Sequence, residues 1–215
     1  MSAKEFWGVI EAYGAQIWPA QLVFFIIAIV LIAWLFLKPS RLSNALLKLY
    51  FVFSFGWSGI VFFMILGREI SGRSYFWGSL FVVVALLFAV DIYRRKMAFC
   101  LPQANWQRWV TLILMLVVLC YPLFSIALGR SFPAIIFPGT LPCPTTALAL
   151  VLLTTALPRV DKLIYFLLLF WAIPFPPFIQ IPKYGVYEDG IMLCIGIYSL
   201  IMLVTHWREK PALSN

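Results

Sequence analysis

The feature that most constrains this chain is its set of long, uninterrupted apolar segments. Residues 23–37 read VFFIIAIVLIAWLFL, without one charged side chain. About 20 apolar residues in a helix cross the ~30 Å hydrocarbon core of a bilayer. Lipid forces every backbone polar group to bond within the protein, which leaves only helices and closed barrels. Barrel strands alternate apolar and polar residues. These segments do not alternate, so they predict helices.

Composition indicates the same class of protein. Of 215 residues, 64% are hydrophobic and 11% are charged, whereas soluble domains are about half apolar and a quarter charged. A chain of this length cannot hide so many apolar side chains inside itself, so we expect the lipid bilayer to cover them. The net charge of +8 would suggest nucleic acid in a soluble protein. Here the basic residues flank apolar segments, and no nucleic-acid partner is expected.

The apolar segments predict an all-α membrane protein with about seven transmembrane helices. They form one predicted bundle over residues 20–206, followed by a short cytoplasmic tail at 207–215. The expected helices are 20–37, 45–66, 75–93, 107–128, 143–157, 161–178 and 190–206.

The first 19 residues predict an amphipathic helix that lies in the membrane interface. Ser2 and Glu5 have the spacing of a capping box. Apolar residues recur at helical spacing opposite Lys4, Glu5 and Glu11, and tryptophans stand near both ends. Proline interrupts a helix, so we expect Pro19 to end this one.

The distribution of Lys and Arg predicts the orientation in the membrane. With the N-terminus outside, eleven of the 16 basic residues lie on the cytoplasmic side and five outside, and cytoplasmic loops carry the excess. We therefore predict an outer N-terminus and a cytoplasmic C-terminus. The eleven are Lys38, Arg41, Lys48, Arg94, Arg95, Lys96, Arg108, Arg159, Lys162, Arg208 and Lys210. Asp91 precedes three of them and is expected to form an ion pair there.

Proline breaks the pattern in the C-terminal half. Two apolar stretches, 132–146 and 173–182, are rich in proline, so we expect non-helical backbone at 132–144 and 174–182. The fifth and sixth helices are thus predicted to be broken, with short antiparallel pieces at 145–157 and 162–173. Interrupted helices of this kind mark the binding sites of transporters.

A candidate ligand site lies at Pro142-Cys143-Pro144-Thr145-Thr146. The two prolines predict an extended Cys143, and Thr145 and Thr146 then open a helix whose free N–H groups favour an anion. A thiol at that position is also a candidate reactive group or metal ligand. The alternative is an ordinary helix start with a small buried cysteine.

Three residues at or just before the start of the last helix are expected at the same depth as Cys143. Cys194 is a candidate partner for Cys143 in a disulfide or a soft-metal site. Glu188 and Asp189 precede the helix, where acidic residues either cap it or contribute to a cation site. The candidate ligands are therefore a small solute, an anion or a soft metal ion.

No catalytic motif is present, and His206 is the only histidine. An enzyme is therefore not the favoured class. Three classes stay open: a small transporter or channel with an outer cavity between helices five, six and seven; a membrane thiol redox protein using Cys143; and an accessory membrane subunit.

Two stretches resemble an uncharacterised family of bacterial multi-pass membrane proteins, a domain of unknown function. They are Tyr13-Gly14-Ala15-Gln16-Ile17-Trp18-Pro19-Ala20-Gln21 and Pro138-Gly139-Thr140-Leu141-Pro142-Cys143-Pro144-Thr145. The resemblance would cover most of the chain. It implies a prokaryotic inner membrane, and it implies no activity or cofactor.

Overall fold

The computed structural model describes residues 1–70 and 73–207, and every regular element among them is a helix. Arg208 and Lys210, with most of the predicted tail, lie outside the described residues. The elements are α1 (Ala3–Leu37), α2 (Arg41–Trp57), the π-helix η1 (Ser58–Leu66), α3 (Ser74–Arg94), α4 (Asn105–Leu119), α5 (Tyr121–Ala127), α6 (Pro142–Thr154), α7 (Lys162–Ala172), the π-helix η2 (Pro176–Gln180), α8 (Ile181–Tyr184) and α9 (Asp189–Thr205).

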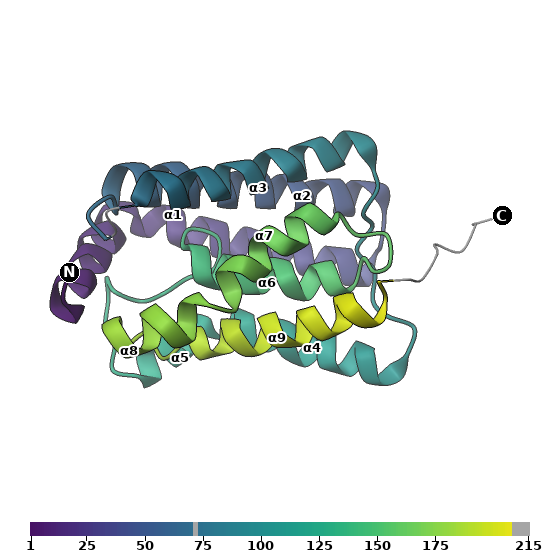
Figure 1. Cartoon of the computed structure of the whole chain (residues 1–215). Coiled ribbons are helices and arrows are strands. Elements are labelled where there is room, and N and C mark those ends of the chain that lie inside the picture. Colours follow the sequence, from purple (N-terminus) through teal and green to yellow (C-terminus); the bar gives the residue numbers. More distant parts are fainter. Residues whose placement is uncertain (71–72, 208–215) are drawn as a thin grey trace.

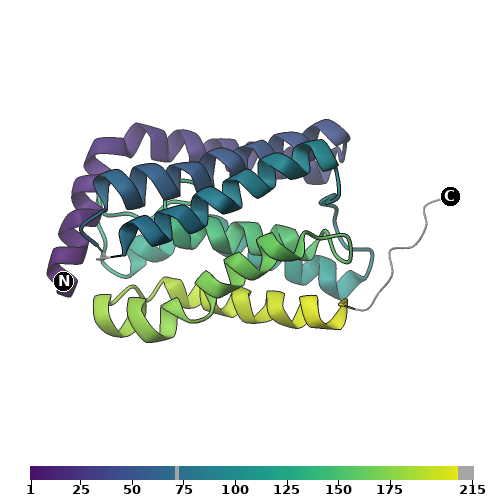
Figure 2. The same ribbon diagram turned by 45° about the horizontal axis from the view of Figure 1, so that its top comes forward.

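The N-terminal helix begins as predicted and ends much later. Ser2 and Glu5 form the capping box in both directions. The expected end at Pro19 is wrong, because α1 continues through Pro19 to Leu37. A single proline removes one backbone hydrogen bond and bends a helix more readily than it stops a long apolar one. Figures 1 and 2 show the first turns of α1 bending away from the rest. The location of these first turns in the membrane interface stays a prediction.

Four of the described helices are long and apolar enough to cross a membrane. They are Ala3–Leu37, Arg41–Leu66, Ser74–Arg94 and Lys162–Tyr184, and α4 with α5 makes a fifth if their 54° bend lies within one span. The remaining apolar helices, α6 and α9, have 13 and 17 residues. The prediction of an all-α membrane bundle is therefore confirmed at the level of four to five candidate spans.

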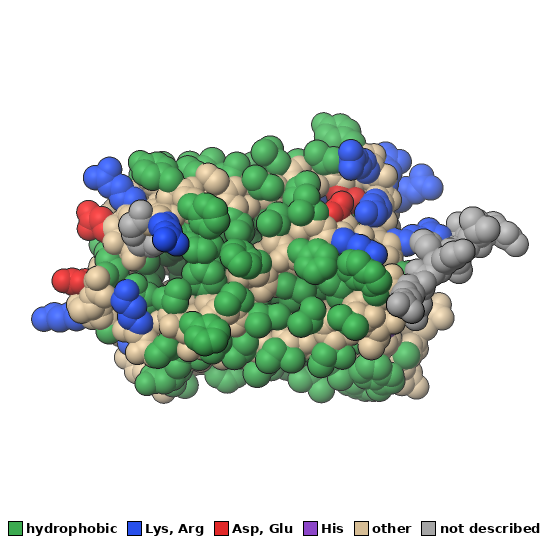
Figure 3. All heavy atoms as spheres, in the orientation of Figure 1, with side chains coloured by type: hydrophobic (Ala, Val, Ile, Leu, Met, Phe, Trp, Pro, Cys, Tyr) green, Lys and Arg blue, Asp and Glu red, His purple; other side chains and the backbone are tan. Residues whose placement is uncertain are grey.

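The surface has the polarity that a bilayer requires. Figure 3 shows hydrophobic side chains over the middle of one face, with Lys, Arg, Asp and Glu gathered toward its two ends. Large apolar side chains such as Ile26, Val30 and Phe53 are 56%, 55% and 61% exposed. Exposed apolar area on this scale calls for lipid, because soluble monomers do not expose such patches.

The short helix α6 lies at the centre of the bundle. Every residue from Pro144 to Thr154 is buried, and α6 contacts α2, α4, α7 and α9. A helix that is apolar on all sides belongs in a core. Because neighbouring helices separate α6 from lipid, it need not match the full bilayer thickness. It runs antiparallel to α7, which it contacts (Figure 1), and this confirms the predicted pair.

The two proline-rich stretches differ from one another. Residues 132–141 contain no helix, as predicted, but α6 starts at Pro142, so the expected extended conformation of Cys143 is wrong. Residues 174–182 were expected to be non-helical, and this is also wrong, because η2 and α8 continue the helical path of α7 after a turn at 173–174. Prolines stand at the first positions of α6, η2 and α8, where a missing N–H costs nothing.

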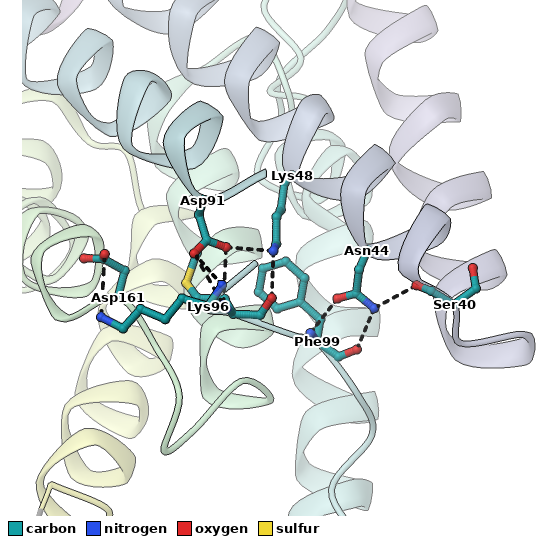
Figure 4. Close-up of polar contacts among 8 residues, drawn as sticks. Ser40, Asn44, Lys48, Asp91, Lys96, Phe99 and Asp161 are labelled. Carbon is teal, nitrogen blue, oxygen red and sulfur yellow. Dashed lines mark hydrogen bonds and ion pairs between the residues drawn. The ribbon is translucent and has the colours of Figure 1, made fainter. Parts of the chain in front are cut away.

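A polar network (Figure 4) holds the segment between α3 and α4, which lies at the opposite end of the bundle from the N-terminus (Figure 1). Lys48 of α2 lies 2.7 Å from the Asp91 carboxylate of α3 and also donates to the Met97 carbonyl oxygen. Asp91 accepts hydrogen bonds from the backbone N–H groups of Lys96 and Met97. The expected ion pair of Asp91 therefore exists, with Lys48 as its partner.

Candidate functional site

A cavity of about 400 Å³ lies at the end of the bundle that carries the N-terminus. It is enclosed by α1, η1, the start of α6, the α7–η2–α8 path and the start of α9. Its wall is mainly aromatic, with side chains that include Phe6, Phe62, Phe63, Trp77, Trp171 and Phe175. Glu69, Arg73 and Lys183 also border it and are exposed. The volume of the cavity and its aromatic lining are typical of a small-molecule site.

Asp189 is the buried carboxylate of this cavity. It is the first residue of α9 and is 1% exposed. The Tyr121 hydroxyl donates to its Oδ1 at 3.3 Å, and the Cys143 thiol lies beside the carboxylate. Its Oδ2 has no hydrogen-bond partner within the described part of the chain, and no Lys or Arg there forms an ion pair with it. The side chain thus has unused capacity to accept hydrogen bonds.

Cys143 and Gln180 bring the two proline-rich stretches together. Gln180 Nε2, at the end of η2, lies 3.1 Å from Cys143 Sγ in the first turn of α6. Gln180 is 7% exposed, and its Oε1 has no partner among the described residues. Trp171 is 4% exposed, and its Nε1 lies beside the Cys143 thiol and has no hydrogen-bond partner among the described residues. All three side chains line the cavity.

Glu188, the other predicted acidic residue, is used for structure. Its Oε1 accepts from the Ser125 hydroxyl at 3.2 Å and lies 3.8 Å from Arg130 Nε. Arg130 also donates to the Gly185 carbonyl oxygen and stacks over the Trp7 ring. Burial raises the pKa of Glu188, while Arg130 and Ser125 oppose that rise. Glu188 does not line the cavity, so the acidic pair divides into a structural residue and a candidate site residue.

The two predicted threonines are buried inside the fold. Thr145 Oγ1 accepts from the Gly139 N–H at 2.8 Å and donates to the Leu141 carbonyl oxygen. Thr146 is fully buried, and neither threonine borders the cavity. The predicted anion site at this helix start does not fit the structure. Two of the first three residues of α6 are prolines without an N–H, and the Thr145 N–H donates to Leu141.

The structure does not place Cys194 at the site. Its side chain is exposed on α9, whereas Cys143 borders the cavity, and both are free thiols. The described residues contain no group of three or more His, Cys, Asp or Glu that could hold a metal ion. The predicted pairing of Cys143 with Cys194, as a disulfide or a soft-metal site, therefore has no support in the geometry.

Of the residues that the sequence singles out, Cys143 and Asp189 line the cavity, whereas Gln180, Trp171 and the aromatic wall were not predicted. Gln180 had a detectable signal, since it is the one polar side chain in the stretch 173–182. The wall had none, because the chain contains 20 Phe and 9 Trp, and only the fold shows which of them meet.

A helical bundle with an apolar mid-zone and, at one end, a mainly aromatic cavity that carries a few buried polar side chains defines an integral membrane protein with a candidate small-molecule site. The chain belongs to the Family of unknown function (DUF6064), whose model matches residues 3–213. This confirms the resemblance to a family without known function; the bacterial origin that it implies stays a prediction. Comparison with curated proteins and with solved structures finds no match.

Proposed function

We propose that this protein binds a small solute in the cavity and carries it across the membrane. The supporting observation is the set of unsatisfied polar atoms on buried, cavity-lining side chains: Asp189 Oδ2, Gln180 Oε1 and Trp171 Nε1. A buried polar group without a partner costs ~1–3 kcal/mol. Three around one cavity fit a site whose ligand supplies the missing hydrogen bonds.

The shape of the cavity fits a transport intermediate that is open at one end. Its lining reaches no farther along α6 than Pro144, and the rest of α6 is buried on all sides. Passage to the other side therefore needs a rearrangement around the site. The turn at 173–174 and the π-helix η2 join two α-helical pieces next to Gln180, and such irregular segments absorb the backbone changes of hinge motions.

The proposal includes seven membrane spans in a prokaryotic inner membrane, with the cavity facing outward. Cys100 is exposed near the cluster Arg94–Lys96, and Ser131 is exposed at the cavity end, next to Arg130. In intact cells, an impermeant maleimide should label a single cysteine introduced as Ser131→Cys and leave a single Cys100 unlabelled until the membrane is opened. The reverse pattern would overturn the orientation.

Access of water to the cavity is tested with Cys143 as a native reporter. A variant with Cys100, Cys120 and Cys194 changed to serine keeps only this thiol. We expect the charged reagent 2-(trimethylammonium)ethyl methanethiosulfonate to modify Cys143 in right-side-out vesicles. A single-Cys194 variant is the matched control, because the Cys194 thiol is exposed on the surface of the bundle and should be shielded by lipid. Modification of Cys143 only after denaturation in detergent would refute the open cavity and with it the proposed function.

A further inference from the structure

We infer that the solute is a small organic cation, an ammonium group on an apolar body, with its charge bound at Asp189 and its body against the aromatic wall. This inference rests on the proposed function, because it names the ligand class of the same cavity. It uses three independent features of the site: the uncompensated carboxylate, the arrangement of the rings and the unpaired amide oxygen.

The first feature is the charge balance around Asp189. Arg130, the basic residue that reaches the start of α9, is paired with Glu188, and no basic residue among those described pairs with Asp189. Arg73 and Lys183 border the cavity, but their side chains are exposed, so water screens their charge. Asp189 is 1% exposed, and Coulomb attraction is several-fold stronger at low dielectric than in water. The buried carboxylate thus favours a cation within the cavity.

The second feature is the aromatic wall. Trp171 stacks on Phe175 with ring centroids 4.1 Å apart, and it meets Phe63 edge to face at 5.7 Å. Trp77 packs edge-on against Phe175 at 4.6 Å. Rings held in this way are ordered before a ligand arrives. The faces of Trp, Tyr and Phe attract cations, and cages of such rings bind alkylammonium groups.

The third feature is the unpaired Oε1 of Gln180. A primary ammonium carries three donors, which can be shared between Asp189 Oδ2 and this amide oxygen. The unpaired Trp171 Nε1 is a donor, so it can donate a hydrogen bond to an oxygen atom on the body of the ligand. A metal ion fits less well, because no suitable ligand cluster exists among the described residues and the wall offers rings in place of oxygen atoms.

The test compares three probes of similar shape and different charge. 2-Phenylethylamine is cationic at neutral pH, 2-phenylethanol is neutral and 3-phenylpropionate is anionic. Each is added to the single-Cys143 protein in detergent, and the rate of Cys143 modification by the small neutral reagent methyl methanethiosulfonate is measured. A bound probe shields the thiol, so we expect the amine at millimolar concentration to slow modification about tenfold and the other two to leave it nearly unchanged.

Two variants localise the effect. Asp189→Asn removes the charge and should abolish protection by the amine. Glu69→Gln is the control, because Glu69 borders the same cavity but is exposed, and protection should persist. The comparison of the three probes in the otherwise unchanged chain decides the ligand class even if Asp189→Asn fails to fold.

Each of the remaining outcomes contradicts one stated part of the proposal. Equal protection by the alcohol and the amine, or stronger protection by the carboxylate, would leave solute binding standing and overturn the cation. A reactive Cys143 that no probe protects would overturn the cation class alone. An unreactive Cys143 in the folded protein would overturn the open cavity, and the cation site with it.

Discussion

The hydroxyl of Tyr13 in α1 donates a 2.7 Å hydrogen bond to the carbonyl oxygen of Thr140. This bond joins α1 to the non-helical stretch before α6, although 127 residues separate its partners. Trp57 Nε1 in turn donates to the Tyr13 oxygen at 2.9 Å. The non-helical stretch 132–141 is thereby fixed to α1 and α2 just before it enters α6. These contacts position the start of α6, where Cys143 meets the cavity.

Tyr13→Phe should lower the free energy of unfolding. The substitution leaves the Thr140 carbonyl and the Trp57 N–H without their partner in a buried site, at a cost of ~1–3 kcal/mol. Tyr75→Phe is the control. Because Tyr75 is 67% exposed, this substitution should change the free energy of unfolding little. The measurement is SDS-induced unfolding in micelles followed by tryptophan fluorescence. Equal effects of the two substitutions would contradict the assigned role of the Tyr13 hydroxyl.

A second prediction concerns the crossing of η1 and α3. A Cβ at Gly59 would lie 2.6 Å from the Gly78 carbonyl oxygen, and a Cβ at Gly78 would lie 2.7 Å from that of Gly59. Small residues allow this close approach of two backbones. Gly59→Ala and Gly78→Ala should each destabilise the protein by ~1–3 kcal/mol through overpacking.

Gly56→Ala is the matched control for that crossing. Gly56 precedes Gly59 by three residues, and a Cβ there would meet nothing within 4 Å. Alanine favours a helix over glycine by up to ~1 kcal/mol, so this variant should be as stable as the original or more stable. Loss of stability in Gly56→Ala equal to that in Gly59→Ala would contradict the assigned role of the crossing, because a Cβ at Gly56 meets no neighbour.

The helical segments could be predicted because hydropathy is a local property of the sequence. The long segments 45–66 and 75–93 correspond closely to Arg41–Leu66 and Ser74–Arg94. The predictions made from Pro19 and from the prolines of 174–182 are wrong. The rule that proline breaks helices assumes a regular α-helix interior. It does not anticipate a long helix that bends, or prolines at the first positions of new helical segments.

The candidate site could be predicted only in part, because tertiary contacts decide which polar groups are already paired. The sequence treats Glu188 and Asp189 alike, whereas the fold pairs Glu188 with Arg130 and leaves Asp189 at the cavity. It likewise treats Thr145 and Thr146 alike. The convergence of Gln180 on Cys143 spans 37 residues and depends on how η2 packs, which no local pattern reveals.

The two adjacent threonines give a third prediction. Thr145→Val removes the acceptor of the buried Gly139 N–H and should cost ~1–3 kcal/mol of unfolding free energy. Thr146→Val should be neutral or slightly stabilising, because the Thr146 hydroxyl is buried without a partner among the described residues. Thr145→Ser keeps the hydroxyl and should retain most of the stability. If Thr146→Val instead weakened protection of Cys143 by 2-phenylethylamine, Thr146 would belong to the ligand site.

The fourth prediction concerns the buried ion pair at the opposite end of the bundle. Lys48 and Asp91 are 2.7 Å apart, with side chains 4% and 3% exposed. Replacing Lys48 by methionine leaves an unpaired buried carboxylate, which costs ~3–5 kcal/mol. It also removes the hydrogen bond to the Met97 carbonyl oxygen, so the segment before α4 should loosen. We expect a large fall in the SDS concentration at the unfolding midpoint.

The control for the ion pair is Lys96→Met. Lys96 lies 3.8 Å from Asp161, and its side chain is 51% exposed, so water screens the pair and its loss should cost at most ~1 kcal/mol. The double variant Lys48→Met/Asp91→Asn removes the stranded charge and should recover part of the stability lost in Lys48→Met. The introduced asparagine would still present one oxygen to the backbone N–H groups of Lys96 and Met97. A double variant less stable than Lys48→Met alone would show that these backbone hydrogen bonds to Asp91, and not its pairing with Lys48, hold this end of the bundle together.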